Sequence, residues 1–564
     1  MKIKINQLKI IGLLSFVSLC FAFNFGTAVE AQTETRRESV VGRATPTPKQ
    51  TPTAAPTTAP IIVPTPTPTP IQIQTVADLQ SKIRATLFRP DLRRGQVGVK
   101  IVSLDSTRTV FEENAEKYFM PASNMKSYTV AAALEKLSPD FRFITSVFAA
   151  SAPDANGIIK GDLTVFGRGD VSFSTGFYDG DYYKGLTALA EKIAQAGVKR
   201  IEGNLIGDES YFTGNPVPES WEWDDLQWYY GAEISALPVN DNAVDLSVKP
   251  GAAGSPCAVQ ILPANTVMKV VNRCVTVSTN AKRELRVVKK LAQNILEISG
   301  TMPFDDKKGF EGYVAVSRPA QLFVEMLRGL LIQKGVTITG QNKVIGAKDK
   351  SVLTAAAPLA PVEIARLESP PFSLIAAKTM KPSQNTYTET ILWTLGEEIG
   401  RKQAAALATD ESSAARLRTT SSAELGLKAA RDFFAQAGIA GDSIIQWDGS
   451  GLSRHNLITP ASAVQLYTFM SKSRYAAAWR ESLTIGGVDG TLRNRFKGTV
   501  AAGNVRGKTG TIDQVSSLSG YVTTASGERL VFSILVNGVN EVGKRQSAID
   551  EIVVALASFN GRIN

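Results

Sequence analysis

Histidine and cysteine are scarce in this chain. Its 564 residues include one histidine and three cysteines. A zinc site is disfavoured because such sites are built from clusters of these two residue types, and we expect neither a metal nor another cofactor. A Ser-His-Asp triad is nearly excluded, since His455 is the only candidate base. His455 lies in a polar loop, where a surface role is the simpler interpretation.

The hydrophobic run near the start of the chain is short for a membrane anchor, although an uncleaved anchor is the competing interpretation. The apolar stretch from Ile10 to about Phe23 is shorter than the roughly 20 residues that span a bilayer. Lysines precede it, and Ala28 and Ala31 follow it. Residues 1–31 are therefore predicted to be a secretory signal. The mature protein is expected to be exported, to the periplasm or the extracytoplasmic cell wall.

Charge and composition exclude little by themselves. Apolar residues make up 43% and charged residues 20% of the chain, which is typical of a globular protein. Removing a signal with three lysines and one glutamate lowers the formal charge from +10 to +8. A basic exported protein suits anionic surroundings such as the cell wall, although solubility alone could explain the charge. No nucleic-acid motif occurs, and no nucleic-acid partner is expected.

Two further features suit an exported protein. Residues 32–75 are rich in proline and threonine and are predicted to form an extended linker without a packed core. Cys257 and Cys274 are the cysteines that remain after the signal. Oxidising conditions favour a disulfide between them; two buried free thiols are the alternative.

The first candidate for chemistry is Ser123 with Lys126. Apolar residues at helical spacing follow them as far as Leu137, so a helix is predicted to begin here with Ser123 in its first turn. Residues three apart share one helix face. A partly desolvated Lys126 could therefore accept a proton from Ser123. The alternative is a helix-capping serine beside an exposed lysine.

The two ends of the chain are predicted to form one domain. Alternating residues predict a β-hairpin from Val97 to Phe111, and three antiparallel strands between Gly503 and Asn537. Joining them gives a five-stranded antiparallel sheet, covered by helices at about residues 76–90 and 546–559. The predicted fold class is mixed α/β (α+β).

The middle of the chain contains an internal repeat. Residues 186–207 and 320–346 each run from a helix into a strand, which suggests the two halves of one inserted α/β domain. The segment between them is rich in short β-like runs. The predicted organisation is listed by residue number: 76–147 and 366–564 for the outer domain, 148–207 and 316–365 for the inserted α/β domain, and 208–315 for a nested β-rich domain.

Three further motifs strengthen the catalytic interpretation. They are Ser383-Gln-Asn385 before a helical run, Lys508-Thr509-Gly510 at the edge of a predicted strand, and Asp448-Gly-Ser-Gly-Leu452-Ser-Arg454. Ser-x-x-Lys, Ser-x-Asn and Lys-Thr-Gly in this order are the signature of penicillin-binding proteins and serine β-lactamases. With the fourth motif and the large insertion, the chain resembles class C type low-molecular-mass penicillin-binding proteins over about residues 90–560. That family comprises D-alanyl-D-alanine carboxypeptidases/endopeptidases, with a transpeptidase-like domain interrupted by nested domains.

The resemblance implies a role for each motif residue. Ser123 would be the nucleophile and Lys126 its base; Ser383, Asn385 and Lys508 would complete the catalytic set. Thr509, Gly510 and Thr511 would bind the substrate carboxylate, and Leu452 and Arg454 would contact the stem peptide. Gln384 departs from the usual Asp or Asn, at a position not expected to do chemistry. The implied partners are peptidoglycan stem peptides and β-lactams as covalent inhibitors.

Two other functions fit parts of the same pattern less well. A serine β-lactamase shares the acylation machinery, but the glutamate of class A enzymes, four residues before an asparagine, is missing after Ser383. A non-catalytic wall-binding protein gives no reason to retain all the motif residues. The choice between carboxypeptidase and endopeptidase, the oligomeric state, and peripheral association with the wall or membrane are left open by the sequence.

Overall fold

The computed structural model describes residues 75–349 and 361–563. The predicted signal and nearly all of the predicted linker lie outside these residues. Within the described ranges, no helix combines the length and the apolar character needed to cross a membrane.

The two ends of the chain share one antiparallel sheet, as predicted. Its strand order is β19-β20-β21-β22-β1-β2, and β1 lies beside β22 with Val99 opposite Ile534. The strands are β1 (Gln96–Ser103), β2 (Thr109–Glu113), β19 (Thr484–Ile485), β20 (Arg506–Ile512), β21 (Val515–Thr523) and β22 (Arg529–Asn537). The prediction of five strands was one short, because β19 has only two residues and shows no alternation.

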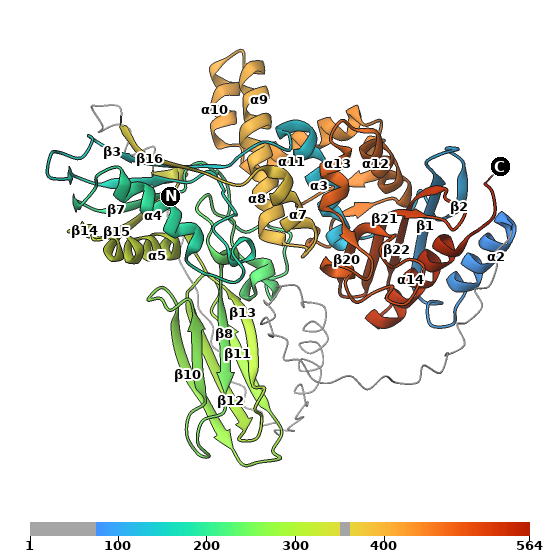
Figure 1. The fold of residues 1–564 in the computed structure, drawn as a ribbon, viewed down its shortest axis with the longest axis horizontal. Helices are drawn as coiled ribbons and strands as arrows, with labels where there is room; N and C mark the ends of the chain where they lie inside the picture. The colour runs from blue at the N-terminus through green and yellow to red at the C-terminus, as the bar shows by residue number, and fades with distance from the viewer. Residues whose placement is uncertain (1–74, 350–360, 564) are drawn as a thin grey trace, which may run out of the picture. The chain divides into compact units, whose positions relative to one another are not determined.

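Helices cover both faces of this sheet. Alternate residues of β22 enter two separate cores: Val531 and Leu535 join one, while Phe532 and Ile534 join the other. Burial on both sides explains the continuous apolar run of this strand. Figure 1 shows α14 and α2 side by side against the sheet, and α12 packs against β22 and β1. These helices are α2 (Val76–Leu87), α12 (Pro460–Lys472) and α14 (Val542–Ser558).

A helical layer surrounds α3 (Met125–Leu137), the helix that follows Ser123. Ten consecutive residues of α3, from Met125 to Leu134, are buried, because α7, α8, α11 and α13 pack around it. The remaining elements of this part are α7 (Phe372–Met380), α8 (Asn385–Leu395), α9 (Lys402–Leu407), α10 (Glu411–Thr419), α11 (Ser422–Gln436), β17 (Ile444–Ile445), β18 (Leu457–Ile458) and α13 (Ala476–Ser482).

The inserted segment contains a five-stranded sheet with the order β15-β7-β5-β3-β16 and a three-stranded sheet with the order β14-β6-β4. Its elements are β3 (Ile144–Ala149), β4 (Ile158–Lys160), β5 (Leu163–Phe166), α4 (Lys184–Gln195), β6 (Arg200–Glu202), β7 (Leu205–Asp208), α5 (Pro319–Gln333), β14 (Thr337–Ile338), β15 (Asn342–Ile345) and β16 (Val362–Glu368). The repeated units lie next to each other, since β14 pairs in parallel with β6, and β15 with β7.

The predicted seams of the insertion cut through two strands. The boundaries at 147/148 and 365/366 fall inside β3 and β16, which pair with each other along their lengths. Both strands belong to the inserted sheet, so we propose seams at about residues 144 and 368 instead.

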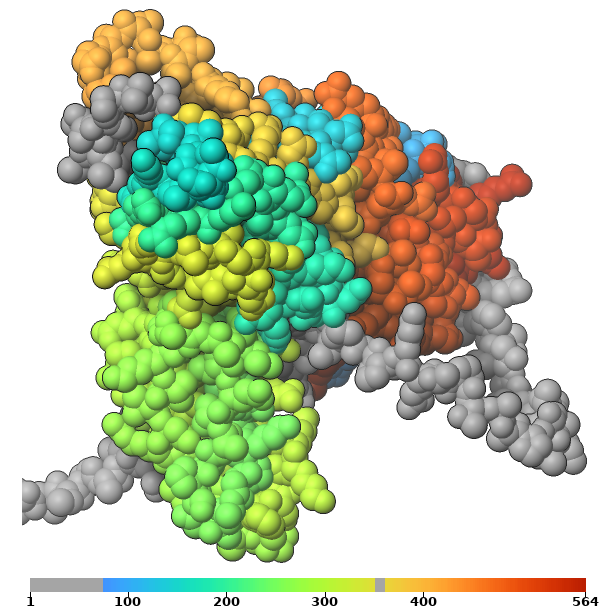
Figure 2. All heavy atoms as spheres, turned by 60° about the vertical axis from the view of Figure 1, so that its left-hand side comes forward, coloured from blue at the N-terminus to red at the C-terminus, as the bar shows by residue number. Residues whose placement is uncertain are grey.

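The β-rich segment forms two three-stranded sheets, β10-β12-β11 and β13-β8-β9. Its strands are β8 (Ala243–Lys249), β9 (Ala258–Leu262), β10 (Lys269–Val277), β11 (Glu284–Lys289), β12 (Ile295–Pro303) and β13 (Phe310–Ala315). One hydrophobic cluster joins this segment to the inserted α/β segment, and Figure 2 shows their green and yellow-green surfaces in contact.

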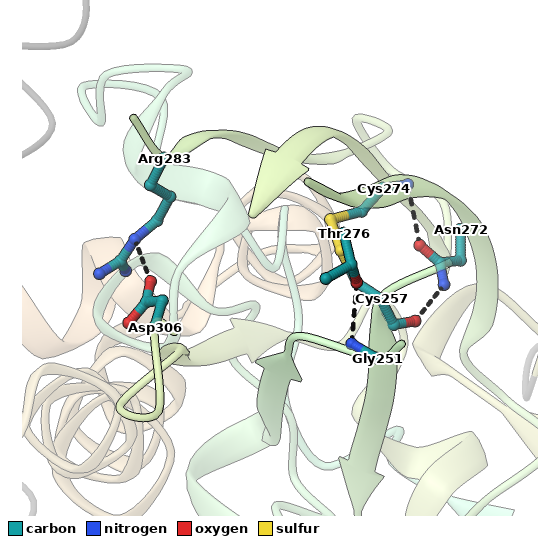
Figure 3. Close-up of a disulfide and its surroundings, with 7 residues drawn as sticks. All are labelled: Gly251, Cys257, Asn272, Cys274, Thr276, Arg283 and Asp306. Atoms are coloured by element: carbon teal, nitrogen blue, oxygen red, sulfur yellow. Dashed lines mark hydrogen bonds and ion pairs between the residues drawn. A yellow bond between two sulfur atoms is a disulfide. The ribbon is translucent and has the colours of Figure 1, made fainter. Parts of the chain in front are cut away.

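Cys257 and Cys274 form a disulfide within the β-rich segment. Figure 3 shows it between two strands, with Asn272 beside it. The Asn272 amide donates to the carbonyl of Cys257 (2.8 Å) and accepts from the amide of Cys274 (3.1 Å). Both cysteines are buried in the shared hydrophobic cluster.

Candidate active site

Ser123 lies on a short 3₁₀ turn, Ala122–Asn124, immediately before α3. Its Oγ is 2.9 Å from the Nζ of Lys126, so the two side chains meet as the spacing predicted. The turn is anchored to the sheet: Asn124 donates to the hydroxyl of Ser517 (2.8 Å), which donates to the carbonyl of Pro121 (2.7 Å). The position of the Ser123 hydroxyl is therefore set by β21 as well as by its own helix.

Lys126 is completely buried. Its Nζ donates to Oδ1 of Asn385 (2.6 Å) and to the carbonyl of Ser450 (2.7 Å). Burial lowers the pKa of Lys126 to about 7, an effect that the carboxylates of Asp448 and Glu389 partly oppose. Desolvation disfavours the charged amine, so Lys126 has the properties of a general base near neutral pH.

The second and third motifs meet at Ser383 and Lys508. Ser383 Oγ is 2.9 Å from Nζ of Lys508, which also donates to the carbonyl of Thr509 (2.8 Å). Lys508 is fully buried, and both this burial and the nearby Lys126 lower its pKa well below the ordinary value. Asn385 bridges to Lys126, so the residues of all three motifs converge on Ser123.

The predicted carboxylate-binding residues lie on β20. Thr509 is buried, and its hydroxyl is 2.7 Å from that of Thr491; Thr511 is half-buried. Gly510 has no room for a side chain, because a Cβ would lie 2.3 Å from the carbonyl oxygen of Pro121. This close approach holds β20 against the turn that carries Ser123.

The loop with Leu452 and Arg454 lies between this centre and the inserted segment. Gly451, at a φ of +82°, packs so closely that a Cβ would be 1.9 Å from the carbonyl oxygen of Ala122. Arg454 is 3.3 Å from the carboxylate of Glu222 and donates to the carbonyl of Asp513 (3.1 Å). Leu452 packs against a hydrophobic cluster that contains Phe212, Trp221 and Trp393. The described contacts of Leu452 and Arg454 are thus with residues outside the three motifs.

Sequence reasoning missed one buried carboxylate, Glu389, and gave no individual role to another, Asp448 of the fourth motif. Glu389 accepts from the amides of Gly449 (2.9 Å) and Ser450 (2.7 Å), and this aims the Ser450 carbonyl at Lys126. Burial raises the pKa of Glu389 to about 8. Asp448 accepts from the amides of Gly451 and Ser453, both at 2.7 Å. The available signal for Glu389 was its position one helical turn after Asn385.

The predicted surface role of His455 agrees with its contacts. Its ring packs on that of Trp447, with centroids 5.2 Å apart, and Trp447 is 53% exposed. Among the residues that the structure describes, no group of three or more His, Cys, Asp or Glu side chains is placed to hold a metal ion.

A serine beside a buried lysine of lowered pKa, with a Ser-x-Asn turn and a Lys-Thr-Gly strand, defines the serine acyl-transfer enzymes of the penicillin-binding type. The D-Ala-D-Ala carboxypeptidase 3 (S13) family matches residues 79–559. The chain belongs to this family and is an enzyme of the serine carboxypeptidase type. The predicted family resemblance and fold class are thereby confirmed.

Individual relatives agree with this assignment. The D-alanyl-D-alanine carboxypeptidase of Actinomadura sp. (strain R39) is 31% identical over 502 residues, which is 86% of each chain. The D-alanyl-D-alanine carboxypeptidase DacB of Haemophilus influenzae is 25% identical over 452 residues, or 78% of this chain and 85% of the relative. Penicillin binding protein 4 (dacB) of Haemophilus influenzae has a similar fold, with a TM-score of 0.67 and 22% identity over 86% of this chain and 98% of that one.

Proposed function

We propose that this protein hydrolyses the D-Ala-D-Ala end of peptidoglycan stem peptides through an acyl-enzyme on Ser123. The observation that carries the proposal is the 2.9 Å contact between Ser123 and the buried Lys126, whose pKa is lowered to about 7. With such a pKa, about half of the lysine is neutral at pH 7 and able to accept a proton.

In the acylation step, the Ser123 Oγ attacks the carbonyl carbon between the two D-alanines and gives its proton to Lys126. The backbone amides of Ser123 and Thr511 are the proposed donors to the oxyanion. The C–N bond then breaks, and the proton that Lys126 took from Ser123 is relayed through the hydroxyl of Ser383 to the departing D-alanine amine. Water hydrolyses the resulting ester and regenerates the Ser123 hydroxyl.

Lys508 has a second proposed role, in binding the terminal carboxylate. Its burial beside Lys126 lowers its pKa in the free enzyme. A carboxylate bound at Thr509 and Thr511 would favour the charged form of Lys508. Substrate binding and protonation of this lysine are therefore coupled. Gly510 would keep the backbone of this strand close enough to Ser123 for both events.

Leu452 and Arg454 are proposed to contact the rest of the stem peptide. Arg454 is 26% exposed, and its contacts with Glu222 and Asp513 hold it at the edge of the loop that follows Gly451. An Arg454→Gln variant should therefore raise KM for a stem peptide with little change in kcat. An unchanged KM would assign Arg454 a structural role.

β-Lactams are proposed as covalent inhibitors that acylate Ser123. Penicillin binding protein 4 of Haemophilus influenzae, which shares the fold, has been solved in complex with a novel β-lactam. We further propose that the protein is exported by residues 1–31, and that residues 32–75 separate the enzyme from the membrane or wall.

Fluorescent penicillin tests the nucleophile. The wild type should be labelled covalently, Ser123→Ala should not, and the matched control Ser127→Ala should be. Ser127 lies four residues further along, on α3, and its hydroxyl hydrogen-bonds with that of Tyr467 (2.9 Å). Persistent labelling of Ser123→Ala would refute the assignment.

The reaction is tested with three substrates offered to the same preparation. Release of D-alanine from a pentapeptide indicates a carboxypeptidase, and cleavage of cross-linked muropeptide dimers an endopeptidase. Rapid turnover of penicillin without release of D-alanine would instead favour a β-lactamase.

A further inference from the structure

The Ser-x-Asn motif is held from outside the outer domain. The amide of Asn385 donates to the carbonyl of Tyr230 (2.8 Å), and the amide of Gln384 donates to Oδ2 of Asp241 (3.1 Å). Tyr230 and Asp241 both belong to the predicted β-rich insertion. Two adjacent residues of the motif are therefore fixed by the inserted segment.

Ser383, the residue before Gln384 and Asn385, has a backbone conformation that needs such support. Ser383 has a φ of +68°, a conformation that is unfavourable for a residue with a side chain. Strained backbone of this kind persists when its surroundings determine it, and it is concentrated at functional sites. Ser383 is followed directly by the two anchored residues, Gln384 and Asn385.

Asp241 lies on an unusual turn of its own. Asn240, Asp241 and Asn242 have φ values of +47°, +61° and +55°, so three successive non-glycine residues are left-handed. Hydrogen bonds hold the turn at both ends. The backbone amide of Asn240 donates to the carbonyl of Phe173 (2.9 Å), and the side-chain amide of Asn242 donates to the backbone carbonyl of Glu233 (2.7 Å). The turn immediately precedes β8 and presents the carboxylate of Asp241 to the outer domain.

That carboxylate is buried among hydroxyl and amide donors. It is 4% exposed, and its Oδ1 accepts from the hydroxyls of Ser174 and Tyr387. Tyr387 lies on α8, two residues after Asn385. Asp241 therefore contacts Gln384 within the motif and Tyr387 just after it, while Ser174 connects it to the inserted α/β segment.

The amide of Gln384 supplies the hydrogen-bond donor that the buried carboxylate of Asp241 requires. Its Nε2 donates to Asp241, and its Oε1 is buried without a hydrogen-bond partner among the described residues. The contact with Asp241 is thus the polar interaction that orients the amide. A carboxylate in place of the Gln384 amide would face the carboxylate of Asp241, which is unfavourable in a buried site.

We infer that Asp241 is a positioning residue for the acylation step, acting through Gln384 to hold Ser383 and Asn385 in place. This inference rests on the proposed roles of Ser383 and Asn385. It makes the inserted β-rich segment a structural part of the active site. Small displacements of a catalytic group can reduce a rate by about a hundredfold, so the effect should appear in the chemical step.

The hydrogen bond between Gln384 and Asp241 is tested by exchanging its donor and its acceptor. The new side chain in Gln384→Glu has the same shape as glutamine, but its carboxylate faces the carboxylate of Asp241. The second-order rate constant for acylation by penicillin should therefore fall about tenfold or more. Adding Asp241→Asn lets the asparagine amide donate to the new glutamate. The double variant should recover to within about threefold of the wild type, because interacting residues show non-additive effects.

A matched control lies four residues along the chain. Asp245 on β8 also accepts from a tyrosine hydroxyl, that of Tyr182, but has no place in the proposed contacts with the motif. Asp245→Asn should acylate at the wild-type rate. Thermal melting of every variant separates lost stability from slowed chemistry, since a merely structural role would lower the melting temperature without slowing acylation of the folded protein.

Each outcome bears on one claim. An unchanged rate for Gln384→Glu, or a slow double variant, would overturn the role of the pair. If Gln384→Glu does not fold, Gln384→Leu removes the hydrogen bond without adding charge, and a wild-type rate there would also overturn the inference. Failure of the wild type to be labelled at Ser123 would instead contradict the proposed function, before any of these variants is compared.

Discussion

The pH dependence of acylation is the most direct test of the buried lysine. Lys126 can accept the proton of Ser123 only when it is neutral, and its burial lowers its pKa to about 7. The neutral fraction rises as pH increases, so the acylation rate should rise through pH 7 and then level off.

The structure sets the size of this effect. With a pKa of about 7, roughly 1% of Lys126 is neutral at pH 5, about half at pH 7 and nearly all at pH 9. The rate should therefore increase about fiftyfold from pH 5 to pH 7, and only about twofold beyond. A lysine with its ordinary pKa of 10.5 would be neutral in only about 0.03% of molecules at pH 7, more than a thousandfold less than expected here.

The assay is the second-order rate constant for labelling by fluorescent penicillin between pH 5 and pH 10. Lys126→Arg is the control, because a guanidinium does not lose its proton in this range, and it should show negligible labelling throughout. A wild-type rate that still climbs tenfold per pH unit between pH 8 and pH 10 would refute a lowered pKa. A rate independent of pH below 7 would refute Lys126 as the base.

Three further predictions concern packing and stability. Gly451→Ala should slow acylation about a hundredfold, because its Cβ would collide with the turn before α3. Gly438→Ala is also at positive φ but in open space, so it should lower only the free energy of unfolding, by about 1 kcal/mol. Equal acylation rates for the two variants would contradict this prediction. The folded pKa of Glu389 is raised to about 8, so its contribution to stability falls as pH rises from about 4.5 to 8. Thermal melting should show the wild type losing stability relative to Glu389→Gln across that range, and a constant difference would disprove it. Replacing Cys257 and Cys274 with serine should lower the free energy of unfolding by about 3 kcal/mol in denaturant titrations, and the folded variant should still acylate at the normal rate.

Local patterns predicted much of the fold. The hairpin of β1 and β2, the three strands β20 to β22, and the helices at both ends appear where alternation and helical spacing placed them. Their union in one sheet was predicted from matching strand content. The two-residue strand β19 was missed because alternation needs several residues. The boundaries of the insertion remain a proposal, because the sequence of a strand does not show which sheet the strand joins.

Part of the active site was likewise predicted from the sequence, and part was not. Ser123 and Lys126 were paired from their spacing on one helix, and the other motifs were associated with them by family resemblance. Their convergence depends on contacts between residues that are far apart in the chain, such as Lys126 with Asn385 (2.6 Å). Glu389 was overlooked, because a carboxylate on a helix usually faces solvent.

By itself, the amino-acid sequence determined which groups are available for chemistry: a serine and a lysine three residues apart, two more motifs in a fixed order, and a single histidine that nearly excludes a Ser-His-Asp triad. Only the tertiary structure decided how those groups behave. Complete burial gives Lys126 its lowered pKa, and the turn with Asp241 reaches the Ser-x-Asn motif from 143 residues away. The physical reason is that desolvation and long-range hydrogen bonds arise from the packing of distant segments, which no local pattern records.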